Sequence, residues 1–434
     1  MSRENAGGES LKQVFKECIK ALLDFCLKHE LFYLVYDLAP KIDIAKRTWF
    51  LDMQLKYAWN KPRFFDLYEE IVKLPEVVRC LDVMLREGFY RGIDAKVVDK
   101  DGRPVQNPDY RQLLIYEVLI PFMLSYVKRF GLKFSDDSFE DLYKELIEYV
   151  YSPKIAYTVV VPLQNFELTG ADEVMIEGLK LRKLKEEEIK VLLGLSGGKM
   201  LGTSFLHTGF LENIYCIEKV AEIPKGSSIN MTTLINDIED FITILRLFKP
   251  GKIGFNALLY YPKTWKESYV ATELFNIPIY TSYPKYILTE PEVNELRKLW
   301  SWYKKVRGTL PKNVKLSLRW FNKSYTEREE MDRLLDLVIA FEALFQASDR
   351  YDLYTARFIG RDKDERKQIY KDMNELRRMR GSITHTGHAD VGREFVDKIE
   401  EYYRHTMRKF VESLATESLT YEDILKEIRE SLLS

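Results

Sequence analysis

Apolar and polar residues follow different periods in three successive parts of the chain. In residues 1–150, apolar side chains recur three and four positions apart, as at Val14, Ile19, Leu22 and Leu23. The stretch FEDLYKELIEYVY closes this part with the same spacing. An amphipathic helix repeats its apolar face every 3.6 residues, so we expect a mostly helical N-terminal region, to which the sequence assigns no role.

Residues 151–285 change to the pattern of strands. IAYTVVVPLQNFEL is rich in β-branched and aromatic residues, and EVMIEGLKLRKL alternates apolar with polar positions. ENIYCIEKVAEI and KIGFNALLYY have the same character. One helical period interrupts them, from Leu234 to Leu245, and Lys249-Pro250-Gly251 ends it. These patterns predict an α+β middle domain over residues 151–285.

Residues 286–434 return to a helical period that lasts to the end of the chain. TEREEMDRLLDLVIAFEALFQ begins with Thr326 and has Glu329 three residues later, which predicts a capping box. Its expected buried stripe is Leu334, Leu337, Phe341 and Leu344. The predicted fold class is therefore mainly α, with a central α+β region and a helical C-terminal domain over residues 286–434.

Composition narrows the classes of function. A chain of 434 residues is too long for one ordinary core, and its net charge of −1 provides no general attraction for nucleic acid or membrane. The longest apolar run, from Val118 to Val127, is too short to span a bilayer. Four cysteines without a CxxC pair do not favour a zinc ribbon or a disulfide scaffold. We expect a cytoplasmic protein without cofactor, metal or membrane contact.

An arginine occupies an apolar position in the segment NELRRMRGSITHTG. On a helix through Ile369, Met373 and Leu376, the next position of the buried face is Arg380. A guanidinium keeps its proton there, so it requires an anionic partner or a wet cleft. Gly381 is expected to end the helix. A turn at that glycine would let Arg380 and His385 converge on one pocket, whereas a continuous helix would point them about 140° apart.

An arginine and a histidine together are sufficient for metal-independent cleavage of RNA. A histidine with a pKa near neutrality takes a proton from a ribose 2′-hydroxyl or gives one to a leaving oxygen. An arginine stabilises the extra negative charge on a five-coordinate phosphate. The expected products are a 2′,3′-cyclic phosphate and a 5′-hydroxyl, and DNA should resist because it lacks the attacking hydroxyl.

The segment LRRMRGSITHTG resembles the Arg-x4–6-His signature of the HEPN superfamily. The wider stretch RLLDLVIAFEALFQ, followed by ARFIGRDKDERKQIYKDMNELRRMRGSITHTG, is similar to the Apea-like branch. The resemblance is strongest over residues 313–420, weaker over 155–285, and does not extend to the first 150 residues. It implies a four- to five-helix bundle with endoribonuclease activity in defence, stress or toxin-like RNA cleavage. It also implies a homodimer formed through the C-terminal domain.

The resemblance assigns roles to single residues. It makes Arg380 and His385 catalytic and gives Glu342, in AFEALF, the task of bracing the arginine, with Ser382 in support. The sequence departs from the family pattern after the arginine, where Gly381 stands at a position that is usually polar. It departs again after the histidine, where a threonine precedes the usual glycine. These departures put the activity of the site in question.

A local basic excess predicts contacts with RNA. Residues 357–380 contain nine Lys or Arg and five Asp or Glu, an excess of four positive charges. We assign the RNA contacts to Arg357, Arg377, Arg378 and His388. The alternative is a solvated helix face with mixed charge pairs.

Three other interpretations of the C-terminal domain stay open. The domain could be a catalytically inactive HEPN module that binds RNA, a nucleotide or a protein partner. Arg380 could form a purely structural ion pair with Glu342. A metal could be held by the set His385, His388, Asp390 and His405, although their spacing matches no helical metal motif.

Overall fold

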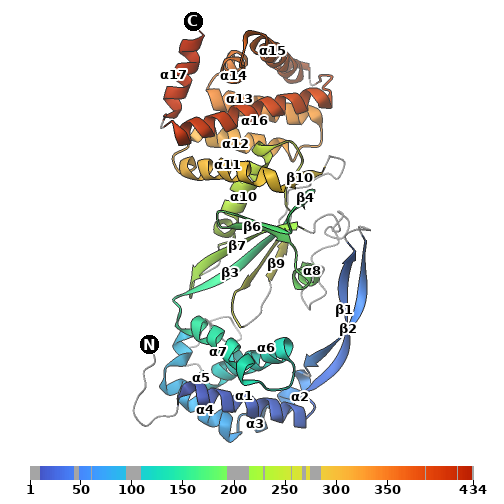
Figure 1. Ribbon diagram of the computed structural model, residues 1–434, viewed down its shortest axis with the longest axis vertical. Coiled ribbons are helices and arrows are strands. Elements are labelled where there is room, and N and C mark those ends of the chain that lie inside the picture. Colours follow the sequence, from blue (N-terminus) through green and yellow to red (C-terminus); the bar gives the residue numbers. More distant parts are fainter. Residues whose placement is uncertain are drawn as a thin grey trace.

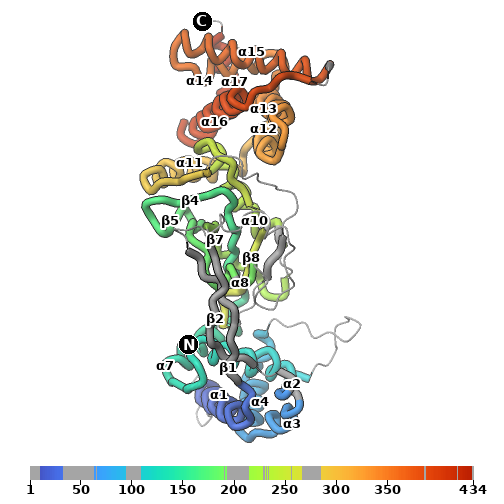
Figure 2. Tube along the Cα trace, turned by 90° about the vertical axis from the view of Figure 1, so that its right-hand side faces the viewer, coloured from blue at the N-terminus to red at the C-terminus, as the bar shows by residue number. Residues whose placement is uncertain are grey.

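The computed structural model describes residues 10–43, 48–59, 61–93, 109–192, 215–227, 230–255, 257–265, 270–273, 285–386, 388–417 and 419–432. It is an elongated and mostly helical chain (Figure 1). The N-terminal helices form one end, a small antiparallel sheet lies in the middle, and a bundle of helices forms the other end (Figure 2). No helix among the described residues combines the length and the apolar character needed to cross a bilayer.

The N-terminal end is built from short amphipathic helices. They are α1 (Leu11–Lys28), α2 (Lys61–Asp66), α3 (Tyr68–Ile71), α4 (Pro75–Arg86), α5 (Tyr110–Leu114), α6 (Ile120–Phe130) and α7 (Asp136–Tyr151), with single turns at Phe89–Gly92 and Ile115–Leu119. Ser10 caps α1 by accepting a hydrogen bond from the backbone of Gln13. The buried face of α1 includes Cys18 and Cys26, and Phe15 packs edge-to-face on Phe122. These helices enclose a hydrophobic core of their own.

The N-terminal region is mostly helical, as the sequence predicts, but a long hairpin that the sequence analysis did not predict interrupts its helices. Strands β1 (Phe32–Asp43) and β2 (Thr48–Trp59) are antiparallel, with Phe32 opposite Trp59. The second strand reads TWFLDMQLKYAW, in which apolar and polar residues alternate as on a half-buried strand. The hairpin leaves the N-terminal helices and runs beside the middle region, where β1 contacts α8 (Glu186–Leu192) (Figure 1).

The strands that the sequence predicts in the middle region form an antiparallel sheet. Its order is β5 (Glu173–Ile176), β6 (Leu179–Lys183), β7 (Tyr215–Pro224), β3 (Lys154–Pro162), β8 (Ala257–Pro262) and β9 (Val270–Glu273). Glu177 and Gly178 both have positive φ at the tight turn between β5 and β6, as a type I′ turn requires. Two further short strands, β4 (Phe166–Thr169) and β10 (Tyr286–Thr289), pair in parallel.

Helix α10 (Met231–Phe248) connects this sheet to the C-terminal helices. Its 3.6-residue period buries Phe241 and Leu245, and the ring of Phe241 packs edge-to-face on Trp300. One continuous cluster of buried side chains therefore extends from the sheet through α10 into the bundle. The described molecule has two large cores, and the middle region shares the second core with the bundle.

The C-terminal bundle begins after a single helical turn at Glu290–Glu292. Its helices are α11 (Val293–Val306), α12 (Lys312–Ser324), α13 (Glu330–Phe345), α14 (Tyr351–Ile359), α15 (Lys363–Thr386), α16 (Arg393–Thr416) and α17 (Tyr421–Ser431). The predicted stripe on α13 is fully buried. The predicted capping box is wrong, because the hydroxyl of Thr326 donates to the carbonyl of Lys323 and α13 begins only at Glu330.

The N-terminal helices are attached to the sheet by side chains as well as by the chain itself. Trp265 follows β8 and is buried in the N-terminal core, near the rings of Phe122 and Tyr149. The ammonium of Lys225, at the end of β7, donates to the carbonyls of Gly92 (2.8 Å) and Val150 (3.0 Å). Trp265 and Lys225 therefore attach the N-terminal helices to the sheet, just after the ends of β8 and β7.

Candidate functional site

Helix α15 runs without a break through the motif segment, from Lys363 to Thr386. The expectation that Gly381 ends the helix is therefore wrong. The physical reason is that the buried stripe continues beyond the glycine, at Ile383, and the hydroxyl of Thr384 donates to the carbonyl of Arg380. The cost of one glycine in a helix, about 1 kcal/mol, is smaller than the gain from a buried stripe on both sides of it.

Because the helix is continuous, Arg380 and His385 do not converge within one chain. Five residues of α-helix turn the side-chain direction by about 140° and advance it by about 7.5 Å. Arg380 lies on the inner face with Leu376, whereas His385 is exposed on the outer face with Arg378 and Ser382.

Glu342 of α13 meets Arg380, as the resemblance implies. The Nη2 atom of Arg380 lies 3.3 Å from the Oε1 atom of Glu342. The Arg380 side chain is 40% exposed and that of Glu342 is 18% exposed. Burial raises the pKa of the Glu342 carboxyl, and the positive charge of Arg380 lowers it in part. The contact is an ion pair without a hydrogen bond to Oε1, and the Arg380 side chain remains partly exposed to solvent.

A second carboxylate–guanidinium pair lies one turn before the first on α15. Arg377 Nη1 lies 3.5 Å from the carboxylate of Asp352 and donates to the carbonyl of Asp349 at 2.9 Å. Asp352 is buried at the beginning of α14. Next to it, Tyr351 is fully buried, and burial together with the charge of Glu342 raises the pKa of its hydroxyl. The sequence analysis missed Tyr351 and Asp352, since nothing in their spacing separates them from an ordinary helix start.

The other predicted RNA contacts have different surroundings. Arg357 donates from Nε to the carbonyl of Ser431 at 2.7 Å, so it closes the end of α17 and its guanidinium is engaged. Arg378 is 73% exposed and lies 3.5 Å from Glu375. His388 is exposed just after α15. Of the four predicted contacts, Arg378 and His388 are presented to solvent, whereas Arg357 and Arg377 take part in the packing of the bundle.

The alternative of a metal site gains no support from the geometry. In the described parts of the chain, no three residues of the types His, Cys, Asp and Glu come together as a possible metal site. His385, His388, Asp390 and His405 are among the described residues. Burial, followed by the charge of Arg408, lowers the pKa of His405. Gly387, between the two motif histidines, lies outside the described residues.

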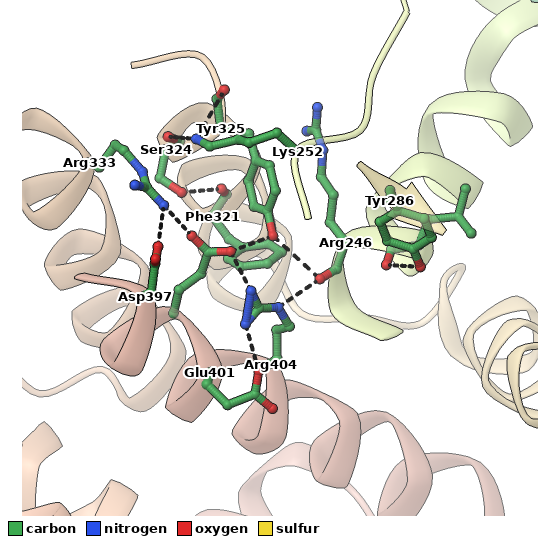
Figure 3. A network of polar contacts seen from close by, with 12 residues as sticks. Arg246, Lys252, Tyr286, Phe321, Ser324, Tyr325, Arg333, Asp397, Glu401 and Arg404 are labelled. Atoms are coloured by element: carbon green, nitrogen blue, oxygen red, sulfur yellow. Dashed lines mark hydrogen bonds and ion pairs between the residues drawn. The ribbon is translucent and has the colours of Figure 1, made fainter. Parts of the chain in front are cut away.

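A second polar centre, which the sequence analysis did not identify, lies between the middle region and the bundle (Figure 3). Glu400 of α16 is buried and accepts hydrogen bonds from Arg404 (2.6 Å), from the Tyr325 hydroxyl (2.6 Å) and from Arg333 (2.7 Å). Arg404 also donates to the carbonyl of Arg246 at the end of α10. We call Arg246, Lys252, Tyr325, Arg333, Glu400 and Arg404 the Glu400 network. Despite its burial, the pKa of Glu400 is lowered, because Arg404 and Arg333 stabilise its charge.

Comparisons with known proteins identify no relative of this chain. The chain matches no protein-family model, no curated protein and no solved structure.

Proposed function

We propose that the C-terminal bundle is a metal-independent endoribonuclease of HEPN type that acts as a homodimer on RNA, in defence, stress or toxin-like cleavage. One observation carries the proposal: Glu342 holds Arg380 at a half-exposed position of the bundle, one and a half turns before an exposed histidine. The carboxylate lies beside the guanidinium, and the exposed part of the Arg380 side chain can donate hydrogen bonds to a phosphate. The motif that the resemblance rests on supplies the chemistry.

The proposed reaction needs no co-reactant. His385 takes the proton of the ribose 2′-hydroxyl, and the 2′-oxygen forms a bond to the adjacent phosphorus. Arg380 stabilises the additional negative charge of the five-coordinate phosphate. The bond from phosphorus to the 5′-oxygen then breaks, and that oxygen receives the proton from the His385 imidazolium. A 2′,3′-cyclic phosphate and a 5′-hydroxyl result.

The angle between the two side chains makes the second protomer essential to this proposal. About 140° of helix rotation separates Arg380 from His385, so one chain cannot present both to the same phosphate. A partner that packs on α15 can bring its own histidine to the arginine. The outer face offers room for such an approach, because a Cβ placed on Gly381 would meet no atom within 4 Å. A two-fold axis would then create two equivalent sites.

The direct test is cleavage of total and transfer RNA in EDTA by the wild type, Arg380→Ala and His385→Ala. We expect each substitution to reduce cleavage by at least about 100-fold, because each removes one stabilising group from the transition state. Arg378→Ala is the matched control, since this arginine is adjacent and exposed. It should retain activity with a modest loss in RNA affinity. The products of the wild type should carry cyclic-phosphate ends.

Mixing the two inactive variants tests the composite site. If each site takes its arginine from one protomer and its histidine from the other, a mixed dimer of Arg380→Ala and His385→Ala has one intact site. Random exchange should then restore about a quarter of the wild-type activity. If both residues of a site come from the same chain, the mixture stays inactive, and the arrangement proposed here is refuted.

A non-catalytic HEPN module that binds RNA, a nucleotide or a protein partner is the outcome if the wild type and both variants are equally inert. In that case the Arg380–Glu342 pair is structural. A lower melting temperature of Arg380→Ala, with unchanged RNA binding, would then be the expected result.

A further inference from the structure

A cleft of about 1080 Å³ lies between α10, α11 and α12. Helix α10 contributes one wall and α12 another, while Tyr303 and Arg307 line the cleft from α11 and the loop after it. Lys219 of β7 also reaches it. The volume exceeds the roughly 300–1,000 Å³ of small-ligand pockets, so the cleft has room for part of a longer chain.

The segment that forms most of α11 and all of α12 before its last residue is strongly basic. From Leu296 to Lys323 it contains nine Lys or Arg and no Asp or Glu. In the whole chain the two kinds of charge are nearly equal, with 66 basic and 67 acidic residues. A solvated helix face usually carries mixed charge pairs, and this segment cannot form any within itself. The positive charge is therefore concentrated in these two helices.

The basic residues of α12 share one face of the helix. Lys312, Lys315, Arg319 and Lys323 are three, four and four positions apart, so they lie within about 80° of one another and extend for about 16 Å. We call these four residues the α12 basic stripe. All of them are exposed, and the last three line the cleft. Lys312 continues the stripe toward the beginning of the helix.

Most of the stripe has no protein counter-ion. In the parts of the chain that the structure describes, the side chains of Lys312, Lys315 and Arg319 form no ion pair. Lys323 differs, because it pairs with Glu327 and Asp336. Small ions from solution must balance the other three charges. A polyanion that displaces such ions gains the free energy of their release.

The carboxylates on the α10 wall are mostly neutralised by other cations. Asp237 pairs with Lys219 (2.6 Å) and with Arg307 (2.5 Å). Asp240 lies 3.1 Å from the same guanidinium. Glu239 also lines the cleft and forms no ion pair with a described residue. Its single negative charge offsets one of the three unpaired charges of the stripe, so an excess of two positive charges remains.

We propose that the α12 basic stripe binds the backbone of single-stranded RNA that lies along the cleft. The choice of RNA among polyanions rests on the proposed function. Lysine and arginine side chains without protein partners contact phosphates of any sequence. Trp320 lies beside the stripe, half-buried, with the Lys323 ammonium 4.9 Å from the centre of its ring. Proteins that bind single strands combine such a basic groove with aromatic side chains.

The stripe shares no residue with the Arg380 site, so its role is to hold the RNA and not to cleave it. The two sites also lie on different helices, α12 and α15. Binding at the stripe can therefore be measured without cleavage.

Fluorescence anisotropy of the full chain with labelled 2′-O-methyl oligouridine tests this inference, because the methyl group blocks cleavage and leaves binding alone. The double variant Lys315→Gln, Arg319→Gln should raise the Kd by at least about tenfold. It should also reduce the slope of log affinity against log salt by about 1.4, since each phosphate contact of a single strand contributes about 0.7. Its melting temperature should equal that of the wild type, because both side chains are exposed.

The double variant Lys73→Gln, Lys426→Gln is the matched control. It removes the same charge from positions that are 74% and 72% exposed and do not line the cleft. Its Kd and salt slope should equal those of the wild type. Equal values in the wild type and the stripe variant would overturn the proposal, as would tighter binding of labelled polyglutamate than of the RNA.

The same variants separate this inference from the proposed nuclease. Binding that depends on the stripe, in a protein that cleaves no RNA, refutes the nuclease and leaves the inference standing. Cleavage by a protein whose RNA binding does not depend on the stripe refutes the inference and leaves the nuclease standing.

Discussion

Gly381 lies inside helix α15, although a glycine at such a position usually indicates a helix end. A glycine between an arginine and a serine is a common helix end, yet here it lies inside α15 with open space beside it. The signal that outweighs it is the buried Ile383, which continues the stripe of Leu376 and Met373. The conformation of a glycine is set by its surroundings, and the surroundings of this one are helical.

Substitution of this glycine should stabilise the protein. Gly381→Ala is expected to raise the free energy of unfolding by about 0.5–1 kcal/mol, since alanine loses less backbone entropy in a helix. Gly251→Ala is the opposing control, because Gly251 has φ of 140° and its added Cβ would lie 2.9 Å from Tyr286. Urea unfolding of both variants decides the matter. A destabilised Gly381→Ala would show that α15 is broken at this position.

Lys252 makes a pH dependence measurable. Burial, followed by the positive charge of Arg333, lowers its pKa to about 7 in the folded chain. Arg246 also lowers it, Glu400 and Glu330 raise it, and the ammonium lies over the Tyr325 ring. In the unfolded chain the ammonium keeps its proton to about pH 10.4. The unfolded state therefore binds more protons between these values, and stability from this group increases as pH rises, by up to about 1.4 kcal/mol per pH unit.

The comparison with a variant isolates this lysine. Lys252→Met should be more stable than the wild type at pH 6, and the difference should shrink from pH 7 to pH 9. Lys249→Met should show no such trend. The measurement is urea unfolding across this pH range in a phosphate-free buffer, and a constant difference would contradict the lowered pKa.

At the scale of elements, α16 is the part that ties the bundle to the middle region. Glu400 and Arg404 lie one turn apart on it and connect α13, the end of α12 and the last carbonyls of α10. Arg408 adds a hydrogen bond to the carbonyl of Phe248. Cations at the end of α10 satisfy carbonyls that have no partner inside the helix.

Removal of the central carboxylate should therefore be costly. Glu400→Gln is expected to lower the free energy of unfolding by about 3 kcal/mol, because it removes the buried carboxylate that Arg333 and Arg404 share and leaves them only their more exposed partners. Its lowered pKa adds an acid dependence: this stabilisation is present above the unfolded value and is lost as the pH falls through the folded one.

Glu401→Gln is the matched control, since Glu401 is 52% exposed and pairs with the same arginine. A change of about 1 kcal/mol or less is expected from a surface ion pair. Thermal unfolding of both variants at neutral pH suffices. Equal losses would mean that burial does not distinguish the two carboxylates.

The helices and the central strands could be predicted from the sequence, because each is amphipathic over its own length. The stripe of Leu334 and Phe341 and the alternation in β5 and β6 need no partner to be recognised. The hairpin of residues 32–59 was missed although TWFLDMQLKYAW alternates clearly. The Arg380–Glu342 pair was expected only because the segment resembles a known family. The Glu400 network could not be predicted, since its members are up to 158 residues apart, as Arg246 and Arg404 are.

At the scale of the whole molecule, two large hydrophobic cores stabilise different parts of the chain. The N-terminal helices have one core, and the sheet shares the other with the bundle. Trp265 belongs to the chain segment after β8 but is buried in the N-terminal core, where it is 1% exposed. Two separate unfolding transitions are therefore expected in calorimetry, one for each core.

Truncation of this tryptophan should act on one transition. Trp265→Ala is expected to destabilise the N-terminal core by about 3–5 kcal/mol through the cavity it leaves. The second transition should stay unchanged. Tyr151→Ala, at a 62% exposed position of the same region, should change neither transition. A single transition that shifts as a whole in Trp265→Ala would show that both cores unfold together.

Trp265 and Lys225, which attach the N-terminal helices to the sheet, have a mechanical consequence. Two parts of a chain that are joined by one flexible linker reorient freely and transmit no force to each other. Here the backbone from Tyr151 to Lys154 forms one connection, and Trp265 and Lys225 form others beside it. Because several connections join the N-terminal helices to the sheet, a force on these helices is transmitted to the sheet, against which α10 and the bundle pack.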